Sequence, residues 1–334
     1  WLGGLWIAVQ PFNFFVLLLG TALGILSGGI PGVSGTMAIA LAIPVTYTMG
    51  PTAGMLLLVS LYASSVYAGS ISGILFRTPG APEGAAATLD GHMMAKKGLA
   101  GEALGWDIFS SVVGGIIGTI ILALVAPQLA KVALEFGPPE YFALAVLGLS
   151  VVSSLGTRNE LKALISVLIG LMIATVGIDK MTGFNRFTFD TTTLLGGIGF
   201  VPTIIGLFAV AEVLNRIKEK RELGGIQAKA RAKLPSFKAI RKLKWLYARS
   251  SIIGSFIGIL PGVGATTASF VGLSEGVRWS KEPEKFGTGI PEGIAAPETA
   301  NNSAASTAMI PMLTLGIPGS AATALMLGAL LIHG

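Results

Sequence analysis

The densest group of polar residues in the chain lies between positions 289 and 323, beside an uncharged apolar stretch. Asn and Ser supply neutral oxygens that suit a small hard cation, and Asn amide groups can also donate to a carboxylate. Polar groups at membrane depth are costly unless they pair or serve a pathway, although hydrogen bonding between helices is the alternative role. We expect a cation-binding site here, beside Glu298. The predicted ligands are Asn301, Asn302 and Ser303, with Ser64 and Ser65 as counterparts earlier in the chain.

Pro-Gly steps recur at matching positions near the two ends of the chain. Residues 28–37 read GGIPGVSGTM and residues 258–267 read GILPGVGATT; RTPG then ends at Gly80 and GIPG ends at Gly319. A helix broken at mid-membrane frees backbone N–H groups that, with the helix dipole, attract an anion. Chance similarity of Gly-rich apolar segments is the alternative. The predicted substrate ligands are Pro31, Gly32, Ser34, Thr36, Pro79, Gly80, Pro261, Gly262, Thr266, Thr267, Pro318, Gly319 and Ser320.

Long uncharged segments must hold these residues in place. Only 12% of the chain is charged, against about 25% in soluble domains. The seven uncharged runs cover residues 1–76, 108–128, 141–157, 163–178, 191–211, 250–274 and 299–334. Runs of this length suit helices that cross the membrane, where backbone amides must pair internally. We therefore predict an all-α polytopic membrane protein. It would have two pseudo-symmetric repeats with broken or re-entrant helices, additional scaffold helices, and about ten to eleven hydrophobic segments in total.

The basic segment 216–249 gives the chain an orientation. It holds twelve of the 23 Lys and Arg residues, and positively charged loops stay in the cytoplasm. This distribution argues against nucleic-acid binding as the reason for the net charge of +6. We expect a fragment that is cut at both ends. Its predicted units are a first repeat with a cytoplasmic loop over 1–105, scaffold helices over 106–215, the basic cytoplasmic loop over 216–249, and a truncated second repeat over 250–334.

Several kinds of chemistry are disfavoured by composition. The chain has no Cys, which excludes disulfides and thiol catalysis, and two His residues are too few to favour a His-based metal site. No cofactor or enzymatic activity is expected. A rhomboid-like intramembrane serine protease is one alternative, because residues 32–35 read GVSG and His333 lies in an apolar segment. The second copy has Gly264 in place of Ser34, so the motif follows the Pro-Gly step instead of a nucleophile. A passive anion channel is the other alternative.

Five longer stretches have a recognisable pattern. They read GIPGVSGTM (29–37), TLDGHMMAKKG (88–98), GILPGVGATTASF (258–270), PEGIAAPETANNSAA (291–305) and IPMLTLGIPGSAATALMLGALLIHG (310–334). On these stretches the chain resembles the large, TctA-like membrane subunit of the tripartite tricarboxylate transporters. It departs from the family pattern at His92 and Met93, where the family usually has Tyr-Pro, and at Arg77, where a neutral polar residue is more common.

The resemblance implies a secondary transporter of the bacterial inner membrane that takes up tricarboxylates such as citrate or related organic carboxylates. It also implies symport with sodium or protons, alternating access, and two protein partners: a small membrane subunit and a periplasmic solute-binding protein. Among the charges near the first repeat, Arg77 is either a substrate ligand or a positive-inside anchor. Lys96 and Lys97 are expected to be cytoplasmic anchors. Glu83 and Asp90 are expected on solvated surface.

Overall fold

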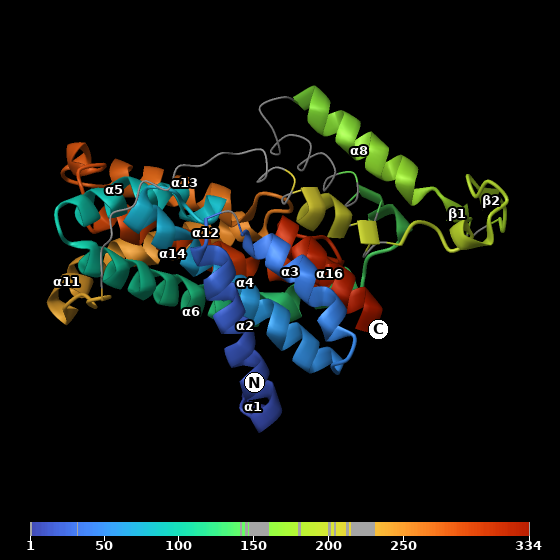
Figure 1. The fold of residues 1–334 in the computed structure, drawn as a ribbon, viewed down its shortest axis with the longest axis horizontal. Coiled ribbons are helices and arrows are strands. Elements are labelled where there is room, and N and C mark those ends of the chain that lie inside the picture. Colours follow the sequence, from blue (N-terminus) through green and yellow to red (C-terminus); the bar gives the residue numbers. More distant parts are fainter. Residues whose placement is uncertain are drawn as a thin grey trace.

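Helices dominate the computed structural model of this chain (Figure 1). The described residues are 2–31, 33–140, 142–143, 146, 160–179, 182–199, 202–203, 205–211, 214 and 231–333. Within them the strands are β1 (Gly177–Ile178) and β2 (Asn185–Arg186), which pair antiparallel with Gly177 opposite Arg186. These strands and α8 (Glu160–Ala174) lie at one end of the longest axis, away from the main helical body. The predicted all-α fold class is confirmed.

Broken helices form the first part of the chain. The elements are α1 (Leu2–Ala8), α2 (Pro11–Gly29), α3 (Gly35–Thr46) and α4 (Pro51–Phe76). Proline is the first residue of both α2 and α4, where its missing N–H costs no hydrogen bond. Between α2 and α3 the chain turns at Pro31, and Ser34 then caps α3 by accepting a hydrogen bond from the Met37 amide at 3.1 Å. The predicted break after residue 30 is therefore present.

The middle of the chain contains one very long helix. After η1 (Pro82–Gly84) and α5 (Ala85–Lys96) follows α6, which covers Ala100–Ala133. At about 1.5 Å per residue its 34 residues reach about 50 Å, more than the hydrocarbon layer requires. The helices α2, α4 and α6 are each long and apolar enough to cross a membrane. Shorter apolar helices, including α3 and α8, accompany them.

One predicted membrane helix is wrong in part. The uncharged run 191–211 begins with η2 (Thr192–Leu194) and then turns, with no α-helix through residue 199. Three glycines lie between positions 196 and 199, and Gly197 has a φ of 79°, which ends helical geometry. The π-helical segment η3 (Ile205–Val210) follows. Most of the predicted span 141–157 lies outside the described residues.

The last part of the chain contains a second set of broken helices. Its elements are α11 (Phe237–Lys242), α12 (Lys244–Ile259), α13 (Gly264–Arg278), η4 (Pro283–Lys285), α14 (Glu292–Thr307), α15 (Met309–Leu315) and α16 (Ala321–His333). Between α12 and α13, Gly262 and Gly264 take φ values of 77° and 72°. Residues with a side chain rarely adopt this conformation, so the Pro-Gly step fixes the break.

Helix α14 occupies the centre of the main body, where it packs against α6, α12 and α13. Every residue from Gly293 to Thr307 is buried. Large apolar side chains cover the outside instead, including Phe12, Phe14 and Phe15 on α2, each at least half exposed. An apolar exterior around a polar central helix suits a protein surrounded by lipid.

Asp90 joins the two halves of the chain and is fully buried, so the prediction of solvated surface is wrong. Its carboxylate accepts hydrogen bonds from the amides of Gly287, Gly289 and Ile290, at 2.7 to 3.0 Å. These amides precede α14, and a loop that leaves its N–H groups unpaired must find an acceptor elsewhere. Asp90 on α5 therefore fixes the entry to the central helix.

We expect Asp90→Ala to lower the free energy of unfolding by about 3 kcal/mol, because its several hydrogen bonds disappear and part-buried amides of the loop are left unpaired. Thermal unfolding in detergent measures the loss. The control is Glu102→Ala, which removes an exposed ion pair to Lys233 at 2.9 Å and should change stability by less than about 1 kcal/mol. Equal melting temperatures for the two variants would show that Asp90 does not hold this loop.

Candidate functional site

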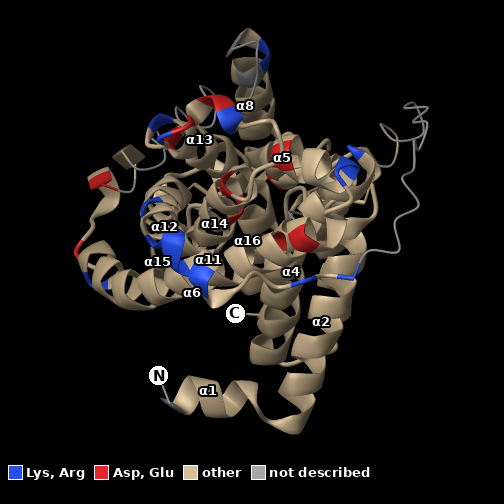
Figure 2. Cartoon of the chain, turned by 90° about the vertical axis from the view of Figure 1, so that its left-hand side faces the viewer, with Lys and Arg blue, Asp and Glu red and all other residues tan. Residues whose placement is uncertain are grey.

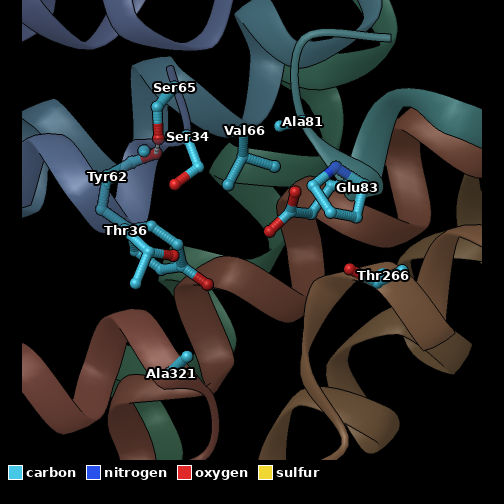
Figure 3. Close-up of a pocket in the computed structure, with 11 residues that line it drawn as sticks. Ser34, Thr36, Tyr62, Ser65, Val66, Ala81, Glu83, Thr266 and Ala321 are labelled. Atoms are coloured by element: carbon cyan, nitrogen blue, oxygen red, sulfur yellow. Dashed lines mark hydrogen bonds between the residues drawn. The ribbon is translucent and has the colours of Figure 1, made fainter. Parts of the chain in front are cut away.

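A cavity of about 340 Å³ lies where the beginnings of several helices meet. The first turns of α3 and α13, the start of α16 and the turn η1 contribute to its wall, together with one face of α4 (Figure 3). Its lining residues are Ser34, Gly35, Thr36, Tyr62, Ser65, Val66, Ala81, Pro82, Glu83, Thr266 and Ala321. Because helix N-termini carry partial positive charge, such a cavity favours a negatively charged group.

Two threonines offer free hydroxyl groups to this cavity. Thr36 lies in the first turn of α3 and Thr266 in the first turn of α13. Neither hydroxyl has a hydrogen-bond partner among the described residues, whereas Ser34 uses its oxygen to cap α3. Free hydroxyls at two helix starts can donate to a carboxylate that enters the cavity.

The structure brings three of the predicted substrate ligands into the cavity wall: Ser34, Thr36 and Thr266. Ser320 lies close by, with its Oγ 3.4 Å from Tyr62 Oη, and the Gly80 amide donates to Gly69 O at 2.9 Å. Gly32 lies outside the described residues. The other predicted ligands are not among the lining residues: Pro31, Pro79, Pro261, Gly262, Thr267, Pro318 and Gly319.

The predicted cation ligands do not form one cluster. Ser65 lines the cavity, but its hydroxyl donates to Tyr62 O at 2.8 Å. Ser64 donates to Ser60 O at 2.6 Å on the side of α4 that packs against α2. Ser303 turns to α12 and donates to Ser251 O at 2.9 Å. The hydrogen bonds of the three serines thus do not involve Asn301 or Asn302.

The two asparagines connect the cavity wall with the interior of α14. Asn301 Nδ2 donates to Glu83 O at 3.2 Å, and Asn302 Nδ2 donates to Asn301 Oδ1 at 2.7 Å. Asn302 Nδ2 also contacts Glu298, at 3.0 Å from its carbonyl oxygen and 3.5 Å from Oε2. Since Glu83 lines the cavity, a continuous polar path runs from the cavity to Glu298.

Sequence reasoning missed two polar side chains of the cavity wall, Glu83 and Tyr62. The Glu83 carboxylate points into the cavity (Figure 3), so the expectation of solvated surface is wrong for this residue as well. The position of Glu83 in the sequence, four residues after Pro79, does not indicate that its side chain faces a cavity. Tyr62 could have been found, because the 239-residue offset of the second Pro-Gly pair equates it with Asn301.

Basic side chains are absent from the described lining of the cavity. Arg77 is exposed, has a φ of 58° at the end of α4, and lies in a different depression beside His92. The ring of His92 lies 3.1 Å from Ile74 O through Nδ1. In Figure 2, acidic segments lie close to α14 in the middle of the protein. Neutral donors and helix ends are therefore the groups that can attract an anion in this cavity, whereas the Glu83 carboxylate would repel an anion when it is ionised.

The alternative of an intramembrane serine protease is not supported by the geometry. Ser34 lies at the start of α3, whereas His333 Nε2 is 3.3 Å from Thr46 Oγ1 at the other end of that helix. The 12 residues of α3 correspond to about 18 Å, far beyond hydrogen-bonding reach.

Comparison with known families decides among the remaining interpretations. The tripartite tricarboxylate transporter TctA family matches residues 14–334, nearly the whole chain. The chain belongs to this family. The resemblance inferred from the five sequence stretches is thereby confirmed, and the family is one of transporters, not of enzymes.

Two curated relatives come from Agrobacterium vitis. One is described as an uncharacterized 52.8 kDa protein in the TAR-I ttuC' 3' region and is 43% identical over 329 residues, 98% of this chain and 65% of the relative. The other, an uncharacterized protein in the TAR-II ttuC' 3' region, is 51% identical over 81 residues, 24% of this chain and 34% of the relative. The chain thus spans 65%, less than two thirds, of the length of the first of these relatives. No solved structure matches this TctA-family chain.

Proposed function

We propose that this chain is the membrane-translocating subunit of a secondary transporter that depends on a binding protein. It takes up tricarboxylates such as citrate, or related organic carboxylates, by alternating access driven by a cation gradient. The observation that carries the proposal is the cavity at the starts of α3 and α13, with free hydroxyls on Thr36 and Thr266. Membership of the TctA family supports the same class of substrate.

Close helix packing supports a two-repeat organisation. At four of the glycines that pack on a neighbouring helix, two in each half, an added Cβ would lie 2.2 to 2.4 Å from a carbonyl oxygen. In chain order these contacts are Gly24–Leu61, Gly28–Ser65, Gly254–Ala300 and Gly258–Ala304. The glycines are related by an offset of 230 and their partners by an offset of 239, the values set by the Pro-Gly steps. We propose that 1–105 and 250–334 are repeats that move against a scaffold in 106–215.

Contacts between the halves fit the same organisation. Helix α3 of the first half packs on α16 of the second half. Helix α13 of the second half packs on η1 and α5 of the first half. A site between two such units is exposed to one side of the membrane or the other as the units move. The proposed cation gradient is of sodium or protons.

The proposed partners are a small membrane subunit and a periplasmic solute-binding protein, as the tripartite family name suggests. We place the chain in the bacterial inner membrane with the basic segment 216–249 in the cytoplasm, because short positive loops remain there. Within the described part of that segment, α11 ends with Arg241 and Lys242.

Two adjacent threonines provide a matched test of the cavity. We expect Thr266→Val to lower uptake about tenfold, because a hydroxyl that can donate to a carboxylate is lost. Thr267→Val should have little effect on uptake, since that hydroxyl donates to Val263 O at 3.0 Å within its own helix. Initial uptake rates per folded protein give the comparison. A larger loss of uptake for Thr267→Val than for Thr266→Val would contradict the assignment of the substrate site to this cavity.

The function itself is tested by reconstituted uptake. The chain, its small subunit and its binding protein are placed in proteoliposomes and offered a panel of dicarboxylates and tricarboxylates, with and without sodium and pH gradients. We expect accumulation that requires both the binding protein and a gradient. Equilibration without either would favour the alternative of a passive anion channel.

A further inference from the structure

Two buried carboxyl groups meet in the centre of the protein. Asp107 on α6 and Glu298 on α14 are each fully buried. Ser111, which donates to Glu298 at 3.1 Å, lies one helical turn after Asp107 on α6, so the two carboxyl groups occupy neighbouring positions. The two helices pack tightly at this level, because Gly114 lies directly against the main chain of Thr299. The pair is thus fixed by the helix contact and is shielded from solvent.

Each carboxyl group has one satisfied oxygen and one unsatisfied oxygen. Ser70 Oγ donates to Asp107 Oδ1 at 2.7 Å, and Ser111 Oγ donates to Glu298 Oε2 at 3.1 Å. The other oxygens, Asp107 Oδ2 and Glu298 Oε1, have no hydrogen-bond donor. A buried oxygen without a donor is rare in folded proteins and points to a missing ligand.

Positive charge does not compensate the pair. None of the ion pairs among the described residues includes either carboxyl group. Tyr67 on α4 is a titratable neighbour that interacts electrostatically with both. Other titratable groups on the elements packed around the pair are Tyr62 on α4, Glu83 on η1, Asp90, His92 and Lys96 on α5, Glu102 and Lys131 on α6, Lys244, Tyr247 and Arg249 on α12, Glu275 and Arg278 on α13, and Glu292 on α14.

Among the described residues, the hydrogen bonds and ion pairs of these other groups are with residues outside the Asp107–Glu298 pair. Tyr247 Oη lies 3.4 Å from Ser110 Oγ, Asp90 accepts from three amides, and the Glu275–Arg278 pair has its cation exposed at the surface. Two neighbouring carboxylates that are both buried in a medium of low polarity repel each other too strongly for both to be ionised. A single proton on the pair would remove one of the two negative charges and supply a donor that the unsatisfied oxygens lack.

The pair is also connected to the cavity. Glu298 Oε2 lies 3.5 Å from Asn302 Nδ2, and the hydrogen bonds of Asn302 and Asn301 lead on to Glu83 O in the cavity wall. A change in the charge of the pair would alter these hydrogen bonds, and a ligand in the cavity would act on the same chain of groups.

We propose that Asp107 and Glu298 together hold one exchangeable proton and form the site at which transport is coupled to protons. The inference rests on the proposed transport function. An O–H bond forms on one carboxylate oxygen when a proton enters from water on one side of the membrane, and it breaks when the proton leaves to water on the other. No other bond changes.

Infrared spectroscopy tests the shared proton without any transport measurement. We expect the full-length protein at neutral pH to show the C=O band of a protonated carboxyl group, and Glu298→Gln and Asp107→Asn each to lose it. Glu102→Gln is the control, because that exposed carboxylate pairs with Lys233 and should not affect the band. Absence of the band in the unmodified protein, or its persistence in both carboxyl variants, would overturn the proposal.

A milder variant covers the possibility that the carboxyl variants do not fold. Ser111→Ala removes a donor to Glu298 and is expected to shift the band in frequency without abolishing it, since a carboxyl group with fewer hydrogen bonds vibrates differently. An unchanged frequency would contradict the assignment to this pair. Loss of the band on addition of sodium chloride to the unmodified protein would mean that sodium occupies the site, which also overturns the proposal.

Transport then separates this inference from the proposed function. Proteoliposomes that contain the complete system should exchange internal for external carboxylate with either Glu298 or Gln at position 298. Accumulation driven by a pH gradient should fall at least about tenfold in Glu298→Gln. Full pH-driven accumulation in this variant would refute the coupling role alone, whereas absence of carboxylate exchange in the unmodified system would refute the transport function.

Discussion

Replacement of Gly114 by alanine is expected to lower the free energy of unfolding by about 3 kcal/mol, whereas the same change at Gly115 leaves it unchanged or raises it by up to about 1 kcal/mol. A Cβ at position 114 would lie 2.3 Å from Thr299 O on α14. Backbone cannot rotate away as a side chain can, so the two helices must separate. A Cβ at position 115 would have no atom within 4 Å.

Thermal unfolding of the purified protein in detergent compares these two neighbours on one helix. The Gly114→Ala and Gly115→Ala variants are well matched, because helix propensity changes equally in both and only the contact with α14 differs. If Gly114→Ala melted together with Gly115→Ala, the close approach of α6 and α14 would be refuted.

Asn301→Ala is expected to reduce uptake per folded protein by at least about tenfold. The side-chain amide of Asn301 donates to Glu83 O and accepts from Asn302, and it is fully buried. Its removal leaves a carbonyl oxygen in the cavity wall without this donor, which costs about 1–3 kcal/mol. The turn that carries Glu83 then loses its attachment to α14. Initial uptake in proteoliposomes measures the effect.

Thr307→Ala is the control from the same helix. Its hydroxyl donates to Ser255 O at 3.0 Å on α12 and has no contact with the turn at Glu83. This variant should lose some thermal stability but keep uptake within about twofold. Equal losses of uptake in both variants would mean that any truncation of a side chain on α14 impairs transport. The proposed role of Asn301 in holding the turn at Glu83 would then be wrong.

The sequence was sufficient for the helical membrane fold and for the places where helices break. Uncharged runs leave helices as the main solution in lipid, and Pro31 and Pro261 each lie at a turn between helices. The predicted donors Thr36 and Thr266 occupy equivalent positions in the two copies of one motif, and both line the cavity. Local chemistry that is repeated in the chain could thus be found without coordinates.

The surroundings of the acidic residues could not be predicted in this way. Asp90, Asp107 and Glu83 lie in segments that also carry small or polar neighbours, and each would suit a solvated loop or helix end. Their burial results from elements far away in the chain: the amides after Phe286 for Asp90, and α14 for Asp107. Neither hydropathy nor repeat spacing contains that information. Composition alone also suggested a membrane helix at residues 191–199, but the glycines there interrupt helical geometry.

The lack of basic side chains in the described lining of the cavity has an electrical consequence. For an inside-negative membrane, each negative charge carried inward meets a cost of about 2.3 kcal/mol per 100 mV. Helix ends and hydroxyls can hold an anion, but they contribute no mobile charge that travels with it. The net charge of substrate plus coupling cations therefore decides how voltage acts, and the single proton proposed for Asp107 and Glu298 would offset one of the two charges of a divalent substrate.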